Sequence, residues 1–445
     1  MQPQRGTDAL VGSEEHTSRE RVYPHCDALH HLDPLPSGHA ALCRRCGTPL
    51  YRSQFTGLDL PLALALTGLV LFVIANGYPL LILELGGRVQ ENSLWTGVTA
   101  LLGRGVWLLA PLVFCTSLLF PALTLAAVVY LLLPLRLRRP PWRHARAVFR
   151  LLTHLNPWSM AGIYLLGLMI AIVKLRDMAH VAPGIALYAF LGLLLVSVAT
   201  QISLDAQLCQ RMLAVGSLQP SQNRGAPPLT LTCSERPAHA TALRAGYMLC
   251  HLCNRLVRQR TVASCPHCGG PLHPRKPASL SRTWALIVAA ALFYIPANLL
   301  PIMTVIRFGQ GEPDTILSGI RHLLESGLWI LALLIFFASI LVPLMKLLVL
   351  SLLLLSIHYR SRRSLKDRTT LYRVLELFGH WSMVDIFLLS ILTALVQLGT
   401  LSTIEPGIGA TFFGVVVVLT MLATKSFDPR LMWDAAEESH EQTNG

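Results

Sequence analysis

The residues whose types and spacing point most directly to chemistry are cysteines, and seven of the ten lie in two clusters. The second cluster reads Cys250-x-x-Cys253, eleven residues, then Cys265-x-x-Cys268. Two such pairs can fold against each other and surround one ion with four thiolates, a tetrahedral cage that suits Zn²⁺. We therefore predict a zinc ribbon at residues 246–275. An iron–sulfur cluster or a redox switch is the alternative. A disulfide is not expected, because this segment is predicted below to face the reducing cytoplasm.

The first cluster departs from this pattern. Cys26 is followed by sixteen residues and then by Cys43 and Cys46, while Tyr23 occupies the position of the missing thiolate. Neutral imidazole also binds zinc well, so a histidine can supply the fourth ligand. The predicted ligand set includes His25, with His30, His31 and His39 as alternatives. The other interpretation is a degenerate ribbon, at residues 21–56, that binds metal weakly or not at all.

These clusters belong to a unit that occurs twice in the chain. Gly87 recurs as Gly309 at an offset of 222, and six further residues recur at the same offset. Trp158-Ser159-Met160 recurs as Trp381-Ser382-Met383 at an offset of 223. An offset this constant indicates an internal duplication. The recurring pairs are Cys43 and Cys265, Cys46 and Cys268, Asn76 and Asn298, Pro79 and Pro301, Trp107 and Trp329, and Pro121 and Pro343.

Composition places this unit in a membrane. The chain is 53% hydrophobic and 14% charged, with a mean hydropathy of +0.52, whereas soluble domains carry roughly 25% charged residues. A membrane-spanning helix needs about 20 apolar residues, and we predict four such spans in each half. They lie at 60–83, 106–135, 157–173, 183–204, 284–306, 328–357, 380–404 and 406–424.

Lysine and arginine counts predict the orientation of these spans. Arginines and lysines are dense at 136–150 and 360–373 and sparse at 85–105 and 307–327. By the positive-inside rule, both termini, both basic loops and the linker 206–280 face the cytoplasm. The net charge of +13 therefore reflects cytoplasmic loops, and no nucleic-acid partner is expected. Because each half has an even number of spans, the halves are parallel repeats.

Two ionisable residues fall inside the predicted spans of the second half. Lys346 interrupts the stretch 328–357, and Asp385 lies near the start of the next stretch. Charged groups are costly in a membrane, so each is a functional hypothesis. The two spans are adjacent and antiparallel, so the long lysine side chain can reach the carboxylate. Helical spacing also places one serine on the face of each charged residue. The predicted polar network consists of Ser339, Lys346, Ser382, Asp385 and Thr420.

Two other interpretations of these charges stay open. The pair can be purely structural, or Lys346 can snorkel to the headgroups without meeting Asp385. The first half has Thr124 and Gly162 at the matching positions, and a pair needed only for folding would be expected in both halves. We therefore predict that the second half is the working module and that the first is a scaffold or docking surface. A change of protonation in the pair would suit proton coupling.

An asparagine and a proline recur near the end of the first span of each half. Asn76 and Pro79 correspond to Asn298 and Pro301. A proline inside a helix removes a backbone donor and kinks the helix, while asparagine can satisfy a freed backbone group. We predict a fixed bend for packing in both spans, with a lateral lipid gate as the alternative.

A ribbon followed by a four-helix block that opens with Ala-Asn-x-x-Pro, and then the same again, resembles the paraquat-inducible protein A family (PqiA/LetA) in its full-length, two-repeat form. The resemblance covers residues 20–434. It is carried by Cys265-x-x-Cys268, Pro296-Ala297-Asn298-Leu299-Leu300-Pro301, His380-Trp381-Ser382-Met383-Val384-Asp385 and Ala423-Thr424-Lys425-Ser426-Phe427-Asp428-Pro429.

This resemblance implies a Gram-negative inner-membrane protein that works with an MCE-domain partner, whose periplasmic tunnel carries lipids between the two membranes. It also implies blocks similar to tetraspanin and claudin folds, and a polar network at the five positions named above. The expected fold is an all-α polytopic membrane protein with eight transmembrane helices in two parallel four-helix repeats. Each repeat is expected to be preceded by a small cytoplasmic zinc ribbon. The two ribbons can then pack against each other.

Domain boundaries follow from these assignments. We predict a disordered N-terminus at 1–20, the first ribbon at 21–56, the first membrane block at 57–208, a linker at 209–245, the second ribbon at 246–275, the second membrane block at 276–434 and a disordered tail at 435–445.

Three functions are compatible with this pattern. The first is a transporter component that passes phospholipids to or from an MCE tunnel, with Zn²⁺ as a structural cofactor. The others are a zinc or redox sensor and a scaffold for an envelope complex. No phosphate-binding loop, nucleophile elbow or HExxH motif occurs, so no enzymatic activity is expected. The duplicated block with its internal charges favours the transporter, since a bare anchor would not need eight helices.

Overall fold

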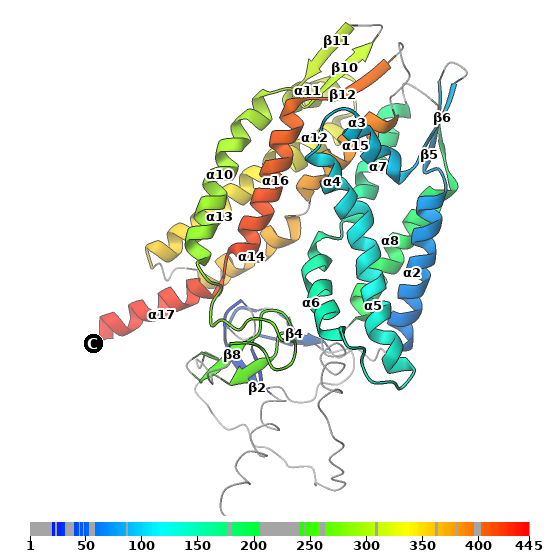
Figure 1. Ribbon diagram of the computed structural model, residues 1–445. Coiled ribbons are helices and arrows are strands. Elements are labelled where there is room, and N and C mark those ends of the chain that lie inside the picture. The colour runs from blue at the N-terminus through cyan, green and yellow to red at the C-terminus, as the bar shows by residue number, and fades with distance from the viewer. Residues whose placement is uncertain are drawn as a thin grey trace, which may run out of the picture.

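The computed structural model contains two groups of four long helices that lie side by side (Figure 1). Within the described part of the chain, eight helices are long and apolar enough to cross a membrane, which confirms the predicted number of spans. The predicted N-terminal segment and most of the predicted linker lie outside the described residues. The structure describes residues 20–22, 25–31, 40–43, 45–47, 49–52, 58–85, 88–176, 180–204, 241–243, 245–258, 263–307, 310–360, 364–379, 381–395 and 402–444.

The elements of the first half recur in the same order in the second half. The first half comprises α2 (Asp59–Gly77), β5 (Leu81–Leu85), β6 (Arg88–Asn92), α3 (Leu94–Gly103), α4 (Leu109–Phe114), η1 (Cys115–Leu119), α5 (Phe120–Arg136), α6 (Ala145–Leu155), η2 (Asn156–Trp158), α7 (Ala161–Arg176), β7 (His180–Pro183) and α8 (Ile185–Ser203). The second half comprises α10 (Ser279–Leu299), β10 (Met303–Arg307), β11 (Gln310–Asp314), α11 (Ile316–Glu325), α12 (Trp329–Phe336), η3 (Phe337–Leu341), α13 (Val342–His358), α14 (Leu365–Phe378), η4 (Trp381–Met383), α15 (Val384–Leu395), β12 (Ser402–Pro406) and α16 (Ile408–Ser426).

Each half carries a three-stranded antiparallel sheet at one end, which the expectation of an all-α protein missed. The strand orders are β6-β5-β7 and β11-β10-β12. We call this the strand end. The opposite end, where β8 (Tyr247–Leu249) leads into Cys250, is called the cysteine end (Figure 1). The first predicted span overran into β5, the fifth into β10 and the seventh into β12, because a short apolar run does not distinguish a strand from the last turns of a helix.

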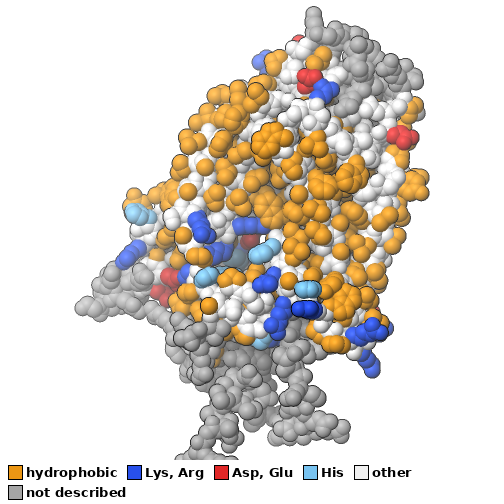
Figure 2. Space-filling model, viewed as in Figure 1, with side chains coloured by type: hydrophobic (Ala, Val, Ile, Leu, Met, Phe, Trp, Pro, Cys, Tyr) orange, Lys and Arg blue, Asp and Glu red, His pale blue; other side chains and the backbone are white. Residues whose placement is uncertain are grey.

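The basic loops of the sequence prediction contain helices. α6 and α14 lie at the cysteine end and are amphipathic: α6 buries Phe149 and Leu152, and α14 buries Tyr372 and Leu375. Apolar residues three apart produce one buried face on each helix. Figure 2 shows hydrophobic side chains covering the surface between the two ends and Lys and Arg gathered toward the cysteine end.

The two halves meet through α15. This helix packs against α7 and α3 of the first half, and all its residues but Asp385 are buried. Tyr164 of α7 makes an edge-to-face contact with Phe387 of α15, with ring centroids 5.3 Å apart. Gly97 of α3 lies so close that a Cβ there would approach the Ser390 hydroxyl to 2.8 Å. Small residues therefore allow α15 to sit tightly against the first half.

The predicted bends in the first spans are wrong, because both prolines lie beyond the helix ends. α2 ends at Gly77 and α10 at Leu299. Tyr78 and Leu300 are extended, with ψ of 160° and 151°. Each of these residues directly precedes a proline, and the proline ring disfavours the helical conformation of the residue before it.

The prolines of this motif instead lie where the first and last helices of each half meet, while each asparagine bonds to the backbone of its own helix. Asn76 donates to the Phe72 carbonyl and Asn298 to the Tyr294 carbonyl, both at 2.8 Å. The Pro301 carbonyl accepts from the Gly409 amide at 3.0 Å, and a Cβ on Gly407 would lie 2.2 Å from the same oxygen. Gly184 has the equivalent position against Pro79. The motif is a tight junction at the strand end.

A further helix, α17 (Arg430–Asn444), follows α16 and runs along the cysteine end (Figure 1). It includes residues 435–444, which the sequence analysis assigned to a disordered tail. Met432 and Trp433 are buried, so the apolar side of this helix has a packing partner that the polar tail composition did not suggest.

We expect Gly407→Ala to destabilise the protein by about 2 kcal/mol or more, because the new methyl group would overlap the Pro301 carbonyl. Gly319→Ala is the matched control: nothing lies within 4 Å of a Cβ at this helical glycine, so alanine should be neutral or stabilise by up to about 1 kcal/mol. Unfolding in mixed micelles measures both. Equal stability of the two variants would contradict the tight junction.

Candidate functional site

Lys346 is buried in the second half. It lies on α13 with 1% of its surface exposed, and its ammonium donates to the Gly379 carbonyl and to the Ser382 hydroxyl, the latter at 3.2 Å. Gly379 caps the C-terminus of α14, and Ser382 lies in the short turn η4 before α15. The last carbonyls of a helix lack intrahelical donors. The ammonium therefore supplies a hydrogen-bond donor to the end of α14, at the break between α14 and α15. Lys346 does not snorkel to the surface.

Asp385 lies in the first turn of α15 and is left without a hydrogen bond. Both carboxyl oxygens are buried and have no partner of normal geometry in the described part of the chain. Ser339 lies on η3, which packs against α15, and its hydroxyl donates to the Ile335 carbonyl at 2.7 Å. Among the described residues, no ion pair joins Lys346 to Asp385. The predicted pair is therefore two neighbouring polar sites, Lys346 with Ser382 and Asp385 with Ser339.

Thr420 of α16 is buried and donates to the Val417 carbonyl of its own helix at 3.0 Å. α16 meets the η4 turn, so the five predicted positions come from elements that meet in the bundle. The structure shows no hydrogen bond from Thr420 to the other four, all of which are described.

Sequence reasoning missed a π-helical turn that places Ser339. The long second span of each half contains one such turn, η1 in the first half and η3 in the second. Pro343 follows η3, and a proline ring clashes with the carbonyl four residues earlier, here that of Ser339. Widening the helix by one residue relieves that clash. The Tyr294 hydroxyl then donates to the Ile340 carbonyl at 3.1 Å. The recurring prolines at 121 and 343 were the available signal.

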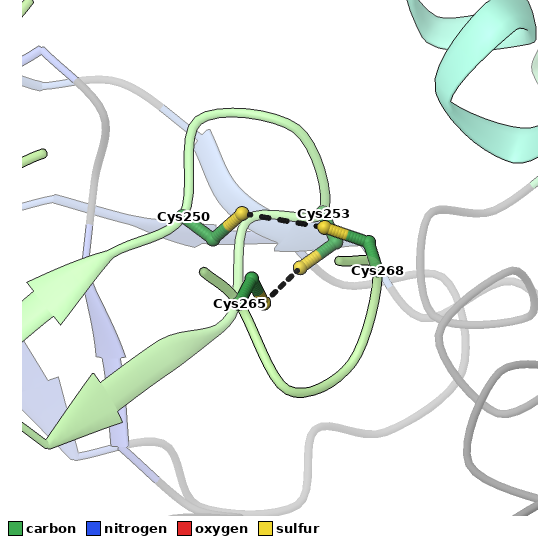
Figure 3. Close-up of side chains that lie close together, drawn as sticks. All are labelled: Cys250, Cys253, Cys265 and Cys268. Atoms are coloured by element: carbon green, nitrogen blue, oxygen red, sulfur yellow. Dashed lines mark hydrogen bonds between the residues drawn. The ribbon is translucent and has the colours of Figure 1, made fainter. Parts of the chain in front are cut away.

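The four cysteines of the second cluster come together as predicted (Figure 3). All four are buried, and their sulfur atoms lie within 4.8 Å of one another. The Sγ atoms of Cys250 and Cys268 are 3.6 Å apart and those of Cys253 and Cys265 are 3.7 Å apart. Burial raises the pKa of the Cys268 thiol to about 11, so a thiolate there requires a compensating cation. Four converging thiols fit a tetrahedral Zn²⁺ site, with these residues as its ligands.

Four turns of the same type present the cysteines. The residue after the last cysteine of each turn has a positive φ: Asp27 57°, Gly47 73°, Asn254 52° and Gly269 69°. Only glycine, and to a lesser degree asparagine and aspartate, adopts this conformation readily. Cys26 therefore sits on the same turn as the others, although Tyr23 replaces its partner. Asp27 and Asn254, each directly after a cysteine, were a sequence signal for these turns that an argument from cysteine spacing alone did not include.

The first cluster contains Cys26, Cys43 and Cys46, all buried and with their sulfur atoms within 4.8 Å of one another. The structure does not bring His25 into this group; its ring packs edge-on against Tyr372 of α14, with centroids 5.8 Å apart. The alternative ligands His30, His31 and His39 lie outside the described side chains. Three thiols can bind a metal ion that retains one open position, and the fourth ligand is not assigned.

The two clusters pack against each other and against opposite membrane halves. Ala28 forms a β-bridge with Thr241, and Val22 and Leu249 share one small core. The first cluster contacts Leu365 of α14 and Trp433 of α17. The second cluster contacts the first half, where Arg150 of α6 donates to the Gly269 carbonyl at 3.1 Å. Each cluster therefore contacts the half that it does not immediately precede.

A buried ion network joins the clusters to the second half. Asp428 is only 1% exposed, and its carboxylate accepts from the Arg430 guanidinium at 3.2 Å and from the Lys276 amide at 3.0 Å. Burial opposes its ionisation, but Arg430 and these amides outweigh burial and lower the pKa of Asp428. Arg430 also donates to His251 at 3.0 Å and lies 3.7 Å from Asp27. Burial and Arg430 lower the pKa of His251 to about 4, which keeps its ring neutral.

These features define a polytopic membrane protein with two cysteine clusters, each able to hold a metal ion, at one end of the bundle. Sequence comparison identifies the family. The sequence profile described as "Paraquat-inducible protein A" matches residues 58–213 and again residues 280–437, which are the two membrane halves. The chain belongs to this family, as its motifs predicted.

Full-length relatives agree with this assignment. The chain is 32% identical over 436 residues to the "Lipophilic envelope-spanning tunnel protein A" of Escherichia coli (strain K12), covering 98% of this chain and 96% of the relative. It is 32% identical over 434 residues to the "Intermembrane transport protein PqiA" of the same organism, covering 96% and 99%. It is 29% identical over 418 residues to the "Probable intermembrane transport protein" of Haemophilus influenzae, covering 92% and 94%. No solved structure matches the chain.

We expect Cys268→Ser to lose the metal of the second cluster, because a neutral hydroxyl cannot replace a thiolate ligand. Metal content per chain, measured by elemental mass spectrometry on purified protein, should fall by about one ion. Cys115→Ser is the control, since Cys115 lies in η1 and in neither cluster. Unchanged metal content in the Cys268 variant would contradict the four-thiolate site.

Asp428→Asn should lower the free energy of unfolding by about 3 kcal/mol, because it leaves the buried Arg430 without its nearest carboxylate. Asp434→Asn is the comparison: Asp434 binds Arg275 at 2.6 Å but its side chain is 29% exposed, so its loss should cost at most about 1 kcal/mol. The same unfolding measurement distinguishes them, and an equal or larger cost at Asp434 would show that the buried network is not what stabilises this end.

Proposed function

We propose that this protein passes phospholipids between the inner and outer membranes of a Gram-negative envelope, together with an MCE-domain protein that forms the periplasmic tunnel. Two relatives named for intermembrane transport and one named for an envelope-spanning tunnel support this proposal. The observation that carries it is the pair of buried polar sites in the second half, around Lys346 and Asp385.

The proposed location is the inner membrane, with both termini in the cytoplasm. Lys and Arg gather at the cysteine end (Figure 2), and positive charge favours the cytoplasmic side. The reducing cytoplasm also keeps the cysteines available for a metal ion. The strand end then faces the periplasm, where the sheets β6-β5-β7 and β11-β10-β12 are available to contact the tunnel protein.

The transport step would use the break between α14 and α15. Lys346 holds this break through Gly379 and Ser382, while Asp385 lies one turn further along without a hydrogen bond. Transfer of the ammonium from the break to the carboxylate would satisfy Asp385 and release the Gly379 carbonyl. Because α15 also packs against α7 and α3, release of the break allows α15 to shift between the halves and open a path for a lipid.

Proton movement is a means of driving this exchange. Protonation of one member of the pair changes the charge that the bundle must bury, and buried charge is costly unless it is paired. A proton gradient acting on Lys346 and Asp385 would then alternately favour two arrangements. In one, Lys346 binds the helix break, and in the other it binds Asp385. Flux through reconstituted protein that ignores an imposed pH gradient and membrane potential would contradict this coupling.

The cysteine clusters favour a second candidate function, metal or redox sensing. Each cluster contacts the opposite membrane half, so loss of metal would change the packing of the clusters against the helices of that half. In that case, removal of zinc would change partner binding in cells, whereas replacement of Lys346 and Asp385 would be tolerated. As part of a transporter, the same metal ions are structural and couple folding of this end to metal binding.

The proposed function is tested by photocrosslinking in cells. A photoreactive residue placed beside Lys346 or Asp385 should capture phospholipid, and Lys346→Ala or Asp385→Asn should abolish the adduct because the path no longer opens. Absence of lipid adducts at several neighbouring positions, together with an intact partner complex, would favour a scaffold instead.

The two halves offer a matched pair of variants for the transport assay. Ser339 and Ser117 occupy equivalent π-helical turns and donate to the carbonyls four residues earlier at 2.7 and 2.6 Å. Ser339→Ala should reduce lipid flux in proteoliposomes about tenfold, roughly 1.4 kcal/mol, because it removes the polar neighbour of Asp385. Ser117→Ala should leave flux unchanged. Equal effects of the two would show that these serines serve only helix geometry.

A further inference from the structure

The first half contains a cavity at the place where the second half holds its polar network. The cavity has a volume of about 240 Å³ and lies between α5, α6, η2 and α8. Thr124, Ser159 and Ser197 line it. At the offsets of the duplication these residues correspond to Lys346, Ser382 and Thr420. Replacement of the long lysine by a threonine therefore leaves room at a site that the repeated fold builds twice.

The lining of this cavity is polar, and Cys253 of the second cysteine cluster is the one ionisable side chain among the described residues that line it. Among the described residues that line it there is no Asp, Glu, Lys, Arg or His. Thr124 donates to the Pro121 carbonyl of its own helix at 2.8 Å. Ser159 and Ser197 are half-buried, and neither hydroxyl has a hydrogen-bond partner in the described part of the chain. These two serines are therefore free to bind a hydroxyl, ester or amide group.

The remaining walls limit the size and direction of a ligand. Val128, Phe149 and Leu152 supply an apolar surface, which suits a short hydrocarbon segment next to the polar groups. Val198, the neighbour of Ser197 on α8, is 48% exposed on the outer surface of the bundle. The cavity is smaller than the roughly 300 Å³ at which pockets for drug-sized ligands begin. It can therefore enclose the polar end of an amphiphile, whose chain would extend into the membrane.

We propose that this cavity binds the uncharged glycerol-ester end of a membrane amphiphile such as a monoacylglycerol. An anionic headgroup is disfavoured because no cation among the lining residues would compensate its charge. The second cysteine cluster closes the cavity on one side through Leu252, Cys253 and Asn254. The site adds a second ligand position to the proposed lipid transporter, but its occupancy does not require transport through the second half.

The test uses full-length protein in detergent and a monoacylglycerol that carries a diazirine near the ester. Labelling should map by mass spectrometry to α5 and α8 around Thr124 and Ser197. Ser197→Phe, which fills the cavity, should reduce labelling at least about fivefold, whereas Val198→Phe on the outer face of the same helix should not. Equal labelling of the two variants would overturn the proposal.

A second variant removes hydrogen bonding without adding bulk. The double change Ser159→Ala and Ser197→Ala should also weaken labelling, and retention of full labelling would overturn the assigned role of the two hydroxyls. A lysophosphatidic acid probe with the same chain should label less; stronger labelling by this anionic probe would overturn the assignment of an uncharged ligand. Thermal unfolding and metal content confirm that each variant is folded.

Lys346→Ala separates this proposal from the proposed transport. Labelling of the cavity in the Lys346 variant should remain at the wild-type level, because the cavity lies in the other half. Loss of lipid flux with intact cavity labelling supports both proposals. Intact flux in Lys346→Ala, together with lost labelling in Ser197→Phe, would contradict only the transport role of the second half. A loss of labelling in Lys346→Ala would contradict the independence of the cavity.

Discussion

Burial of α15 between the two halves is the constraint on which the rest of the structure depends. All residues of this helix other than Asp385 are buried, and the two carboxyl oxygens of Asp385 are buried as well. The first turn of α15 therefore places a carboxyl group where neither water nor headgroups reach it. Two neighbouring elements contact this region. The turn η3, which carries Ser339, packs against α15, and Lys346 donates to the Gly379 carbonyl at the helix break just before it. Close packing against α3 and α7 requires glycines at Gly97 and Gly167. A movement of α15 therefore changes polar partners and the contact between halves together.

The cysteine end links the halves a second time. The first cluster packs against α14 and α17 of the second half, while the second cluster touches α6 of the first half. Arg430 lies at the crossing point, with contacts to Asp428, Asp27 and His251. A buried ion cluster is costly to break once formed, so this end fixes how the halves are oriented. The proposed movement of α15 would then be concentrated toward the strand end, away from the crossed clusters.

Duplication followed by divergence explains why the halves differ in chemistry but share a backbone. Both keep the π-helical turn, the junction at Pro79 or Pro301, and the amphipathic helix at the cysteine end. The second half fills the centre of its block with a lysine, whereas the first half leaves a cavity lined by hydroxyl groups. One fold thus offers an ionisable site and an uncharged site at equivalent positions, which suits a protein that handles amphiphilic molecules.

The sequence alone determined the number of spans, the duplication and the four-thiol cluster, because hydropathy and residue spacing are local properties that the sequence records. It did not determine the sheets at the strand end, the ending of α2 and α10 before their prolines, or the helix at residues 435–444. Those features depend on which segments of the chain pack against each other in the folded protein. Tertiary structure also decided that Lys346 binds a helix break in place of Asp385, that His25 faces Tyr372, and that each cysteine cluster contacts the opposite half. Such pairings join residues from separate elements, and their geometry is set only when the helices pack.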